Sequence, residues 1–299
     1  AMLGTRLLPE SHGAPQRLDL LGVALVTGGV VALVWAMVRA NSVGWLSPQT
    51  LGTLLAGCVL LLAFVRWQRR AHAPLVPLGL FGSRAFAVGT VTTFLMSGAT
   101  FAAAFLITQE FQFARGYSPI STGLRLLPFF ATPMVISPLA GAISDRVGRK
   151  PIMATGLALQ ALGFTWVAAR GSLRTSWVEL AIALLVAGVG ISMALPTVPT
   201  AVLNAVPSAH LGKASGINYM AQRLGTVFAI AIGTAVFSAN GHLGNPAAVT
   251  AGFRPALWST VAFAALAAVT ALAIPSSAHR TNKPKATADN NPADVLVAA

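Results

Sequence analysis

Long apolar runs are the feature of this sequence that most limits what the chain can fold into. Each run holds roughly 20 residues with few charges, which is the length of helix that crosses a hydrocarbon core about 30 Å thick. Lipid offers no hydrogen bonds, so each crossing segment must satisfy its own backbone groups, as a helix does. We therefore predict an all-α membrane protein with about eight transmembrane helices. The expected spans are Leu20–Val38, Thr50–Val65, Phe86–Thr108, Thr122–Ile143, Pro151–Ala168, Val178–Val202, Ser215–Ser238 and Ala256–Ile274.

Composition agrees with a lipid environment and excludes several classes of function. The 299 residues are 55% hydrophobic and only 9% charged, although the net charge is +13. The basic residues lie mostly in short gaps between apolar runs, where they anchor a protein at anionic headgroups. We expect the lipid bilayer as a partner and no nucleic acid. A lone Cys58 and the absence of nucleotide-binding, metalloprotease or serine-hydrolase motifs predict no metal site, no cofactor and no enzyme.

The distribution of basic residues predicts an orientation. Eight spans place both termini on one side of the membrane, and 13 of the 20 Lys and Arg residues then fall on that side. Six fall on the opposite side, and Arg223 lies within a span. Because cytoplasmic loops carry the excess of Lys and Arg, we expect a multi-pass protein of the cell membrane with both termini in the cytoplasm.

One short loop concentrates charge in this otherwise apolar chain. The stretch GAISDRVGRKP holds four charged residues between two spans. Basic residues there are explained by topology, and a glycine suits the tight turn that returns the chain to the membrane. An acidic residue has no such explanation, which indicates a specific role for the carboxylate. The residues of this motif are Gly141, Asp145, Arg146, Gly148, Arg149 and Lys150.

This order of residues resembles the signature loop motif of the major facilitator superfamily. The stretches PLVPLGLFGSRAF, GYSPISTGLRLLP and GVGISMALPTVPTAVLNAVPSAHLGKASG are similar to its fourteen-helix branch of drug:proton antiporters. The resemblance implies multidrug or other small-molecule efflux by alternating access, driven by a proton gradient, with a small lipophilic or cationic substrate. It also implies that the N-terminal half of such a transporter is missing from this chain and would be its partner.

The resemblance further implies a division of the chain. It places a cytoplasmic loop at 1–19, two central helices at 20–66, a cytoplasmic linker at 67–85 and the C-terminal six-helix bundle at 86–274. The polar composition of residues 275–299 predicts a disordered cytoplasmic tail. The alternative is a truncated membrane protein that transports nothing and only assembles with another membrane chain.

Polar residues near or within the spans are candidates for a cavity or for proton coupling. Glu110 ends the third span, where it is either a proton carrier or the partner of Arg125 across a short loop. Asn218, Gln222 and Arg223 form a polar sector of the seventh span. That sector either lines a cavity, or Arg223 extends to the interface while the amides bond between helices.

Helix breakers and small residues complete the candidates. Interior prolines remove a backbone hydrogen bond and kink a helix, which either shapes a cavity or bends the helix around a neighbour. Gly225, Ala229 and Gly233 recur every fourth residue and predict a close helix contact. The expected kinks are at Pro128, Pro133, Pro138, Pro196 and Pro199.

Overall fold

The computed structural model describes residues 19–71 and 74–275, so the predicted N-terminal loop and C-terminal tail lie almost entirely outside the described residues. Within the described part, eight segments are long and apolar enough to cross a membrane, which confirms the predicted all-α membrane fold. The elements are α2 (Leu20–Val43), α3 (Pro48–Gln68), η1 (Leu78–Gly82), α4 (Arg84–Gln109), η2 (Glu110–Ala114), α5 (Pro119–Phe130), α6 (Thr132–Val147), α7 (Arg149–Arg170), α8 (Trp177–Leu203), η3 (Ser208–His210), α9 (Leu211–Asn240) and α10 (Pro246–Ala273).

Serine caps set where several of these helices begin. The side chains of Ser47, Ser118 and Ser176 each accept a hydrogen bond from the backbone N–H three residues later, at 3.2 to 3.3 Å. A helix leaves its first N–H groups without partners, so such caps fix the start of the helix. Proline follows Ser47 and Ser118 at the first helical position, where its missing N–H costs nothing.

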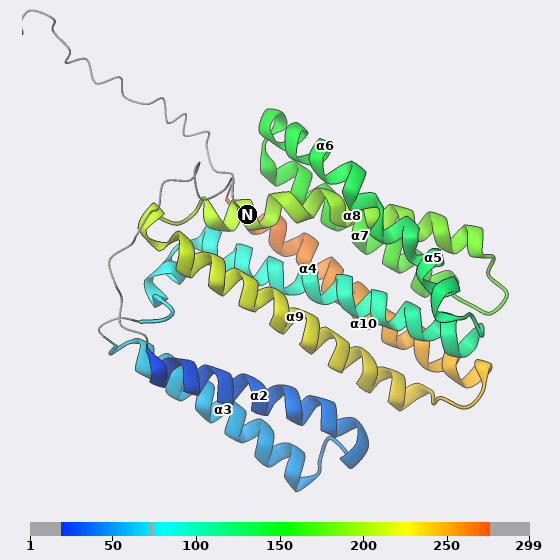
Figure 1. Cartoon of the computed structure of the whole chain (residues 1–299), viewed down its shortest axis with the longest axis horizontal. Helices are drawn as coiled ribbons and strands as arrows, with labels where there is room; N and C mark the ends of the chain where they lie inside the picture. The colour runs from blue at the N-terminus through cyan, green and yellow to red at the C-terminus, as the bar shows by residue number, and fades with distance from the viewer. Residues whose placement is uncertain (1–18, 72–73, 276–299) are drawn as a thin grey trace, which may run out of the picture.

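Helices α4 to α10 form one bundle, and the α2–α3 hairpin lies beside α9 (Figure 1). Helix α4 packs on α9 and α10, and α7 packs on α8 and α10. The chain therefore alternates between two ends of the bundle. We call them the Gly148 end, which also holds the 74–83 connection, and the Gly241 end, which holds the turns near Gly44, Gly116 and Gly171.

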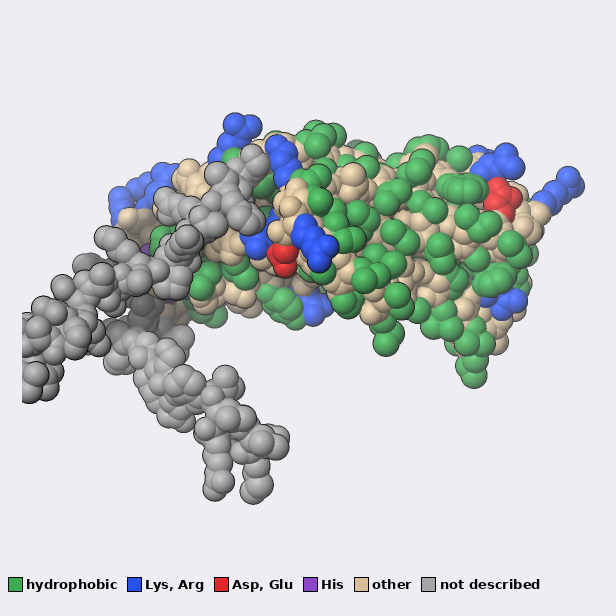
Figure 2. Space-filling view, turned by 90° about the horizontal axis from the view of Figure 1, so that it is seen from above, with side chains coloured by type: hydrophobic (Ala, Val, Ile, Leu, Met, Phe, Trp, Pro, Cys, Tyr) green, Lys and Arg blue, Asp and Glu red, His purple; other side chains and the backbone are tan. Residues whose placement is uncertain are grey.

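Hydrophobic side chains cover the middle of the molecule, and Lys and Arg gather toward its two ends (Figure 2). The outward face of α5 and α6 is strongly apolar, with Met134 81% exposed and Ile120 79% exposed. An apolar surface of this extent favours contact with lipid or another membrane segment, because its exposure to water costs free energy. The surface is thus that of a membrane protein rather than of a soluble bundle.

The last span begins earlier than the sequence predicted. Helix α10 starts at Pro246, ten residues before the expected start at Ala256. Asn245 caps it by accepting a hydrogen bond from the Ala248 N–H at 2.8 Å. Arg254, expected in a loop, lies within the helix and donates to the Ala169 carbonyl at the end of α7 at 3.1 Å. Arg254 and Pro255 therefore lie inside the helix and not in the loop before it.

Candidate functional site

The signature loop is a tight turn between α6 and α7 at the Gly148 end. Gly148 has φ = +91°, a conformation that residues with a side chain rarely adopt, so the glycine is required by the turn itself. Pro151 is the third residue of α7 rather than the first, because Arg149 already begins the helix. Gly141 lies two turns before Gly148 in α6, and its carbonyl accepts the Ser144 hydroxyl at 2.7 Å.

Asp145 and its basic neighbours lie at the surface of this turn. Asp145 and Arg146 are exposed in the last turn of α6, and Arg149 and Lys150 are partly exposed in the first turn of α7. Within the described ranges, the Asp145 carboxylate has no salt bridge and no side-chain hydrogen bond. The loop therefore presents a carboxylate that is unpaired among the described residues, near three cations at one end of the bundle.

Glu110 lies inside the bundle at the Gly241 end, and its partner is Arg115. Arg115 Nε donates to Glu110 Oε1 at 3.0 Å, and the two side chains are 7% and 2% exposed respectively. The Arg115 guanidinium also donates to the carbonyls of Ser172 and Thr175, at 2.7 and 3.0 Å. Arg115 thus joins the Glu110 carboxylate, through the ion pair, to the α7–α8 turn, through its bonds to the two carbonyls.

The expected alternative, a pair between Glu110 and Arg125, is wrong. Arg125 instead stacks on the Tyr117 ring, with its guanidinium carbon 4.0 Å from the ring centre. It donates to the Ser121 carbonyl at 3.2 Å and to the Ser121 hydroxyl. A cation over an aromatic face is stabilised by the ring quadrupole, which explains why this arginine needs no acid nearby.

The three polar residues of α9 diverge rather than forming one patch. The Asn218 Oδ1 accepts a hydrogen bond from Thr93 Oγ1 of α4 at 2.8 Å, so Asn218 bonds between helices. Gln222 is half-buried. Arg223 is exposed and folds back over the Tyr219 ring, 4.7 Å from its centre. Only Asn218 of this set is therefore held inside the bundle by a partner.

The five prolines behave differently from one another. Helix α5 ends at Phe130 and α6 begins at Thr132, so the fourth span is broken between Pro128 and Pro133. Thr132 restores part of the lost bonding, because its hydroxyl donates to the Pro128 carbonyl. Pro138 lies within α6, and α8 continues through Pro196 and Pro199 as a single helix. Of these positions, only the region between Pro128 and Pro133 interrupts a helix in the described residues.

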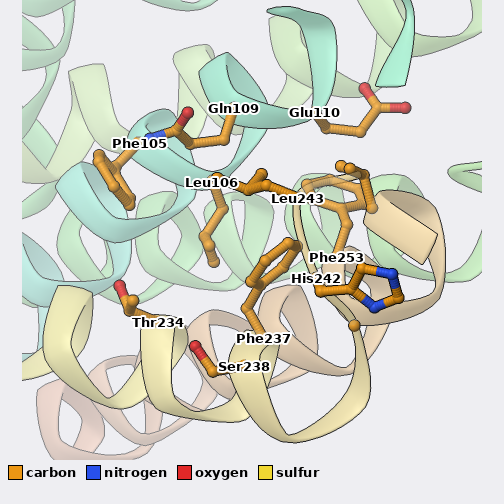
Figure 3. Close-up of a pocket in the computed structure, with 12 residues that line it drawn as sticks. Phe105, Leu106, Gln109, Glu110, Thr234, Phe237, Ser238, His242, Leu243 and Phe253 are labelled. Carbon is orange, nitrogen blue, oxygen red and sulfur yellow. The ribbon is translucent and has the colours of Figure 1, made fainter. Parts of the chain in front are cut away.

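A cavity of about 420 Å³ opens between α4, α9 and α10 at the Gly241 end (Figure 3). No motif of the sequence predicted it, because its wall combines residues between 105 and 110 with residues between 234 and 253, which lie more than 100 positions further along the chain. Its lining residues are Phe105, Leu106, Gln109, Glu110, Thr234, Phe237, Ser238, Gly241, His242, Leu243, Val249 and Phe253.

Sequence reasoning also missed an anchoring cluster around Asp19. The Asp19 carboxylate accepts hydrogen bonds from the Gly22 N–H at 2.8 Å, from Trp67 Nε1 at 2.8 Å and from Gln68 Nε2 at 2.6 Å. Gln68 Oε1 in turn accepts the Val76 N–H at 3.0 Å. One acid therefore joins the start of α2, the end of α3 and the 74–83 connection. An aspartate directly before an apolar run was the available signal, since aspartate is a preferred helix cap.

A second polar contact crosses the core at mid-bundle. Gln160 of α7 is fully buried, and its amide nitrogen donates to Thr100 Oγ1 of α4 at 2.6 Å. Gln160 Oε1 has no hydrogen-bond partner among the described residues. An amide held between two helices inside an apolar bundle fixes their relative register, because moving either helix would leave it unpaired.

The helical fold, the apolar outer surface and the charged turns at its two ends together define a multi-pass membrane protein. Residues 86–297 match the Major Facilitator Superfamily, and the chain belongs to that family. The match begins within α4 and includes every later helix of the bundle. The α2–α3 hairpin precedes the matched residues.

Several relatives are named for drug resistance. The chain is 34% identical over 228 residues to the multidrug resistance protein Stp of Mycobacterium tuberculosis, covering 75% of this chain and 41% of that protein. It is 29% identical over 232 residues to the tetracenomycin C resistance and export protein of Streptomyces glaucescens, covering 76% and 41%. It is 31% identical over 277 residues to the puromycin resistance protein of Streptomyces alboniger, covering 88% and 54%. The chain thus spans about half the length of these relatives.

Proposed function

We propose that this chain is the C-terminal part of a proton-coupled multidrug or other small-molecule efflux transporter that works by alternating access. The observation that carries the proposal is the family match across the bundle, together with relatives named for drug resistance or export that are about twice as long as the matched part. A site between two bundles needs walls from both, so we expect transport only when an N-terminal half is supplied. The alternative, a chain that assembles but transports nothing, remains to be separated by experiment.

The charges of the described residues support an orientation for this protein in the cell membrane. The Gly148 end carries the basic residues of the signature loop together with Arg66, Arg69 and Arg84. The excess of cations at this end favours its placement in the cytoplasm, together with both termini. The Asp145 carboxylate, free within the described residues, would then face a partner in the N-terminal half when the cytoplasmic side closes.

Glu110 is our candidate for the proton-coupling carboxylate of this half. Of the four acids that the described residues contain, it alone is buried within a span. Buried ionisable groups in membrane segments are costly and are usually functional, and protonation of Glu110 would release Arg115 from its partner. A proton arriving from the Gly241 end would in this way loosen the contact between α4 and the α7–α8 turn.

Reassembly of the two halves tests the proposal. Three vesicle preparations would be compared. The first contains this chain alone, the second contains it with the N-terminal half of Stp, and the third contains it with an unrelated six-helix membrane protein. We expect drug accumulation driven by an imposed pH gradient only with the Stp half, and puromycin and tetracenomycin C are the first compounds to test, from the names of the relatives. Assembly without accumulation would support the alternative, and accumulation by the chain alone would contradict the need for a second half.

A further inference from the structure

The cavity at the Gly241 end has the size and form of a small-molecule site. Its volume of about 420 Å³ falls within the range of roughly 300–1,000 Å³ that is typical of ligand pockets. It lies at one end of the bundle, between α4, α9 and α10, rather than at the middle of the spans (Figure 3). It is therefore a different place from the midplane site between two bundles that alternating access requires.

Three phenylalanines from three different helices form its apolar wall. Phe105 comes from α4, Phe237 from α9 and Phe253 from α10, and Phe253 is only 2% exposed. Aromatic pairs prefer offset or edge-to-face contacts that add about 0.5–1.5 kcal/mol beyond simple burial. Rings presented from several directions favour a ligand that itself contains an aromatic ring.

Polar groups line the cavity as well. The side chains of Gln109 and Ser238 lie on its wall and make no hydrogen bond to other residues that the structure describes. The Thr234 hydroxyl donates to the Ile230 carbonyl at 2.8 Å and keeps its lone pairs as acceptors. These groups favour a ligand with hydrogen-bonding atoms over a plain hydrocarbon, which would leave them without partners.

The charges around the cavity disfavour a cation. Glu110 is the one acid that lines it, but its carboxylate points away from the cavity in Figure 3 and is bonded to Arg115 at 3.0 Å. His242 also lines the cavity and supplies no negative charge. A cation entering the cavity would lose its hydration without gaining a free carboxylate. From this arrangement we infer that the cavity binds an uncharged amphiphile of drug size that carries an aromatic ring and a hydrogen-bonding group.

Binding to the full 299-residue chain in lipid nanodiscs tests the inference, with N-phenyl-1-naphthylamine as an uncharged fluorescent probe. Ser238→Trp would fill the cavity, whereas Ala239→Trp places the same side chain at the next exposed position, which is outside the lining. We expect saturable binding to the unchanged chain and to Ala239→Trp, and binding weaker by about tenfold or more in Ser238→Trp. Phe105→Leu, at a partly exposed position, should weaken binding by about threefold through the loss of one ring.

Three results would overturn the inference. The first is equal probe affinity in the two tryptophan variants. The second is that the cation tetraphenylphosphonium displaces the probe as effectively as the uncharged compound 1-naphthol does. The third is a co-purified phospholipid that Ser238→Trp removes while probe binding is unchanged, which would assign the cavity to an acyl chain. None of these measurements involves transport. Failure of the reassembly experiment would therefore leave the cavity inference untouched, and failure of probe binding would leave the proposed efflux function untouched.

Discussion

Glu110 and Arg115 form a buried ion pair at 3.0 Å although they are five positions apart in one continuous segment. In an α-helix, residues five apart project about 140° from each other and their side chains do not meet. The segment from Glu110 to Ala114 is instead a π-helical turn, and the Arg115 N–H donates to the Glu110 carbonyl at 3.2 Å. The wider turn brings residue i+5 back over residue i, so a local change of helix type makes this pair possible.

Breaking this pair should cost far more than breaking an exposed one. Arg115→Met leaves the Glu110 carboxylate buried without a cation, and we expect a loss of about 3–5 kcal/mol in the free energy of unfolding. Denaturation by sodium dodecyl sulfate in mixed micelles would measure it. The double variant Arg115→Met with Glu110→Leu should recover part of that loss, because the unpaired buried charge is gone.

The matched control is the exposed pair of Arg170 and Glu179. Its Nε–Oε1 distance is 3.1 Å, nearly the same, but the two side chains are 68% and 30% exposed. Arg170→Met should change stability by about 1 kcal/mol or less. Equal losses in the free energy of unfolding at the two pairs would show that burial of the Glu110–Arg115 pair does not raise the cost of breaking it.

The Asp19 cluster predicts a pH-dependent attachment of the α2–α3 hairpin. The hydrogen bond from Trp67 lowers the pKa of Asp19 below its usual 3.8, and bonds from Gly22 and Gln68 act in the same direction against some desolvation. A lowered pKa means that the stabilisation is present above the unfolded value and is lost as the pH falls through the folded one. The indole N–H resonance of Trp67 should therefore hold its position from pH 7 to about pH 4.5 and shift at lower pH.

Asp19→Asn supplies the comparison for this titration. The amide keeps one acceptor oxygen but has no charge to lose, so its Trp67 resonance should differ from that of the unchanged chain at pH 7 and should not titrate. A Trp67 resonance that titrates identically in both proteins would exclude Asp19 as the responsible group. Trp67→Phe would assign the resonance among the six tryptophans of the chain.

Close packing between α4 and α9 predicts a large effect at one glycine. A Cβ atom on Gly225 would overlap the Phe94 carbonyl, and Ala229 one turn later is 1% exposed. This confirms the helix contact expected from the spacing of small residues. Gly225→Ala should push the two helices apart and cost several kcal/mol, about as much as an overpacked or broken core contact.

Gly216 on the same helix provides the control. A Cβ atom there would meet nothing within 4 Å. Gly216→Ala should leave stability unchanged or raise it by about 0.5–1 kcal/mol, because alanine has the higher helix propensity. Comparing the melting temperatures of the two variants separates the cost of the close contact from any general effect of adding a methyl group.

The sequence was sufficient to find the eight spans, because apolar length follows directly from the thickness of a bilayer, but it placed the start of the last one ten residues too late. It was also sufficient for the turn at Gly148, because a glycine between two spans indicates a tight turn and the backbone there has a positive φ. It failed for the partner of Glu110, since helical spacing assumes an α-helix and the chain forms a π-helical turn there. It failed again for the cavity, whose phenylalanines come from three helices that only the packing brings together.

Asp145→Asn separates a functional from a structural role for the signature loop. Within the described residues the Asp145 carboxylate is exposed and has no salt bridge, so the substitution should change the stability of this chain by less than about 0.5 kcal/mol. In vesicles that hold both halves, drug accumulation should fall about tenfold or more, because charge-assisted hydrogen bonds contribute about 1.5–3 kcal/mol. Glu179→Gln, which removes an acid at the Gly241 end, should retain accumulation. A matching loss of stability in the isolated chain would instead identify Asp145 as a structural residue of the α6–α7 turn.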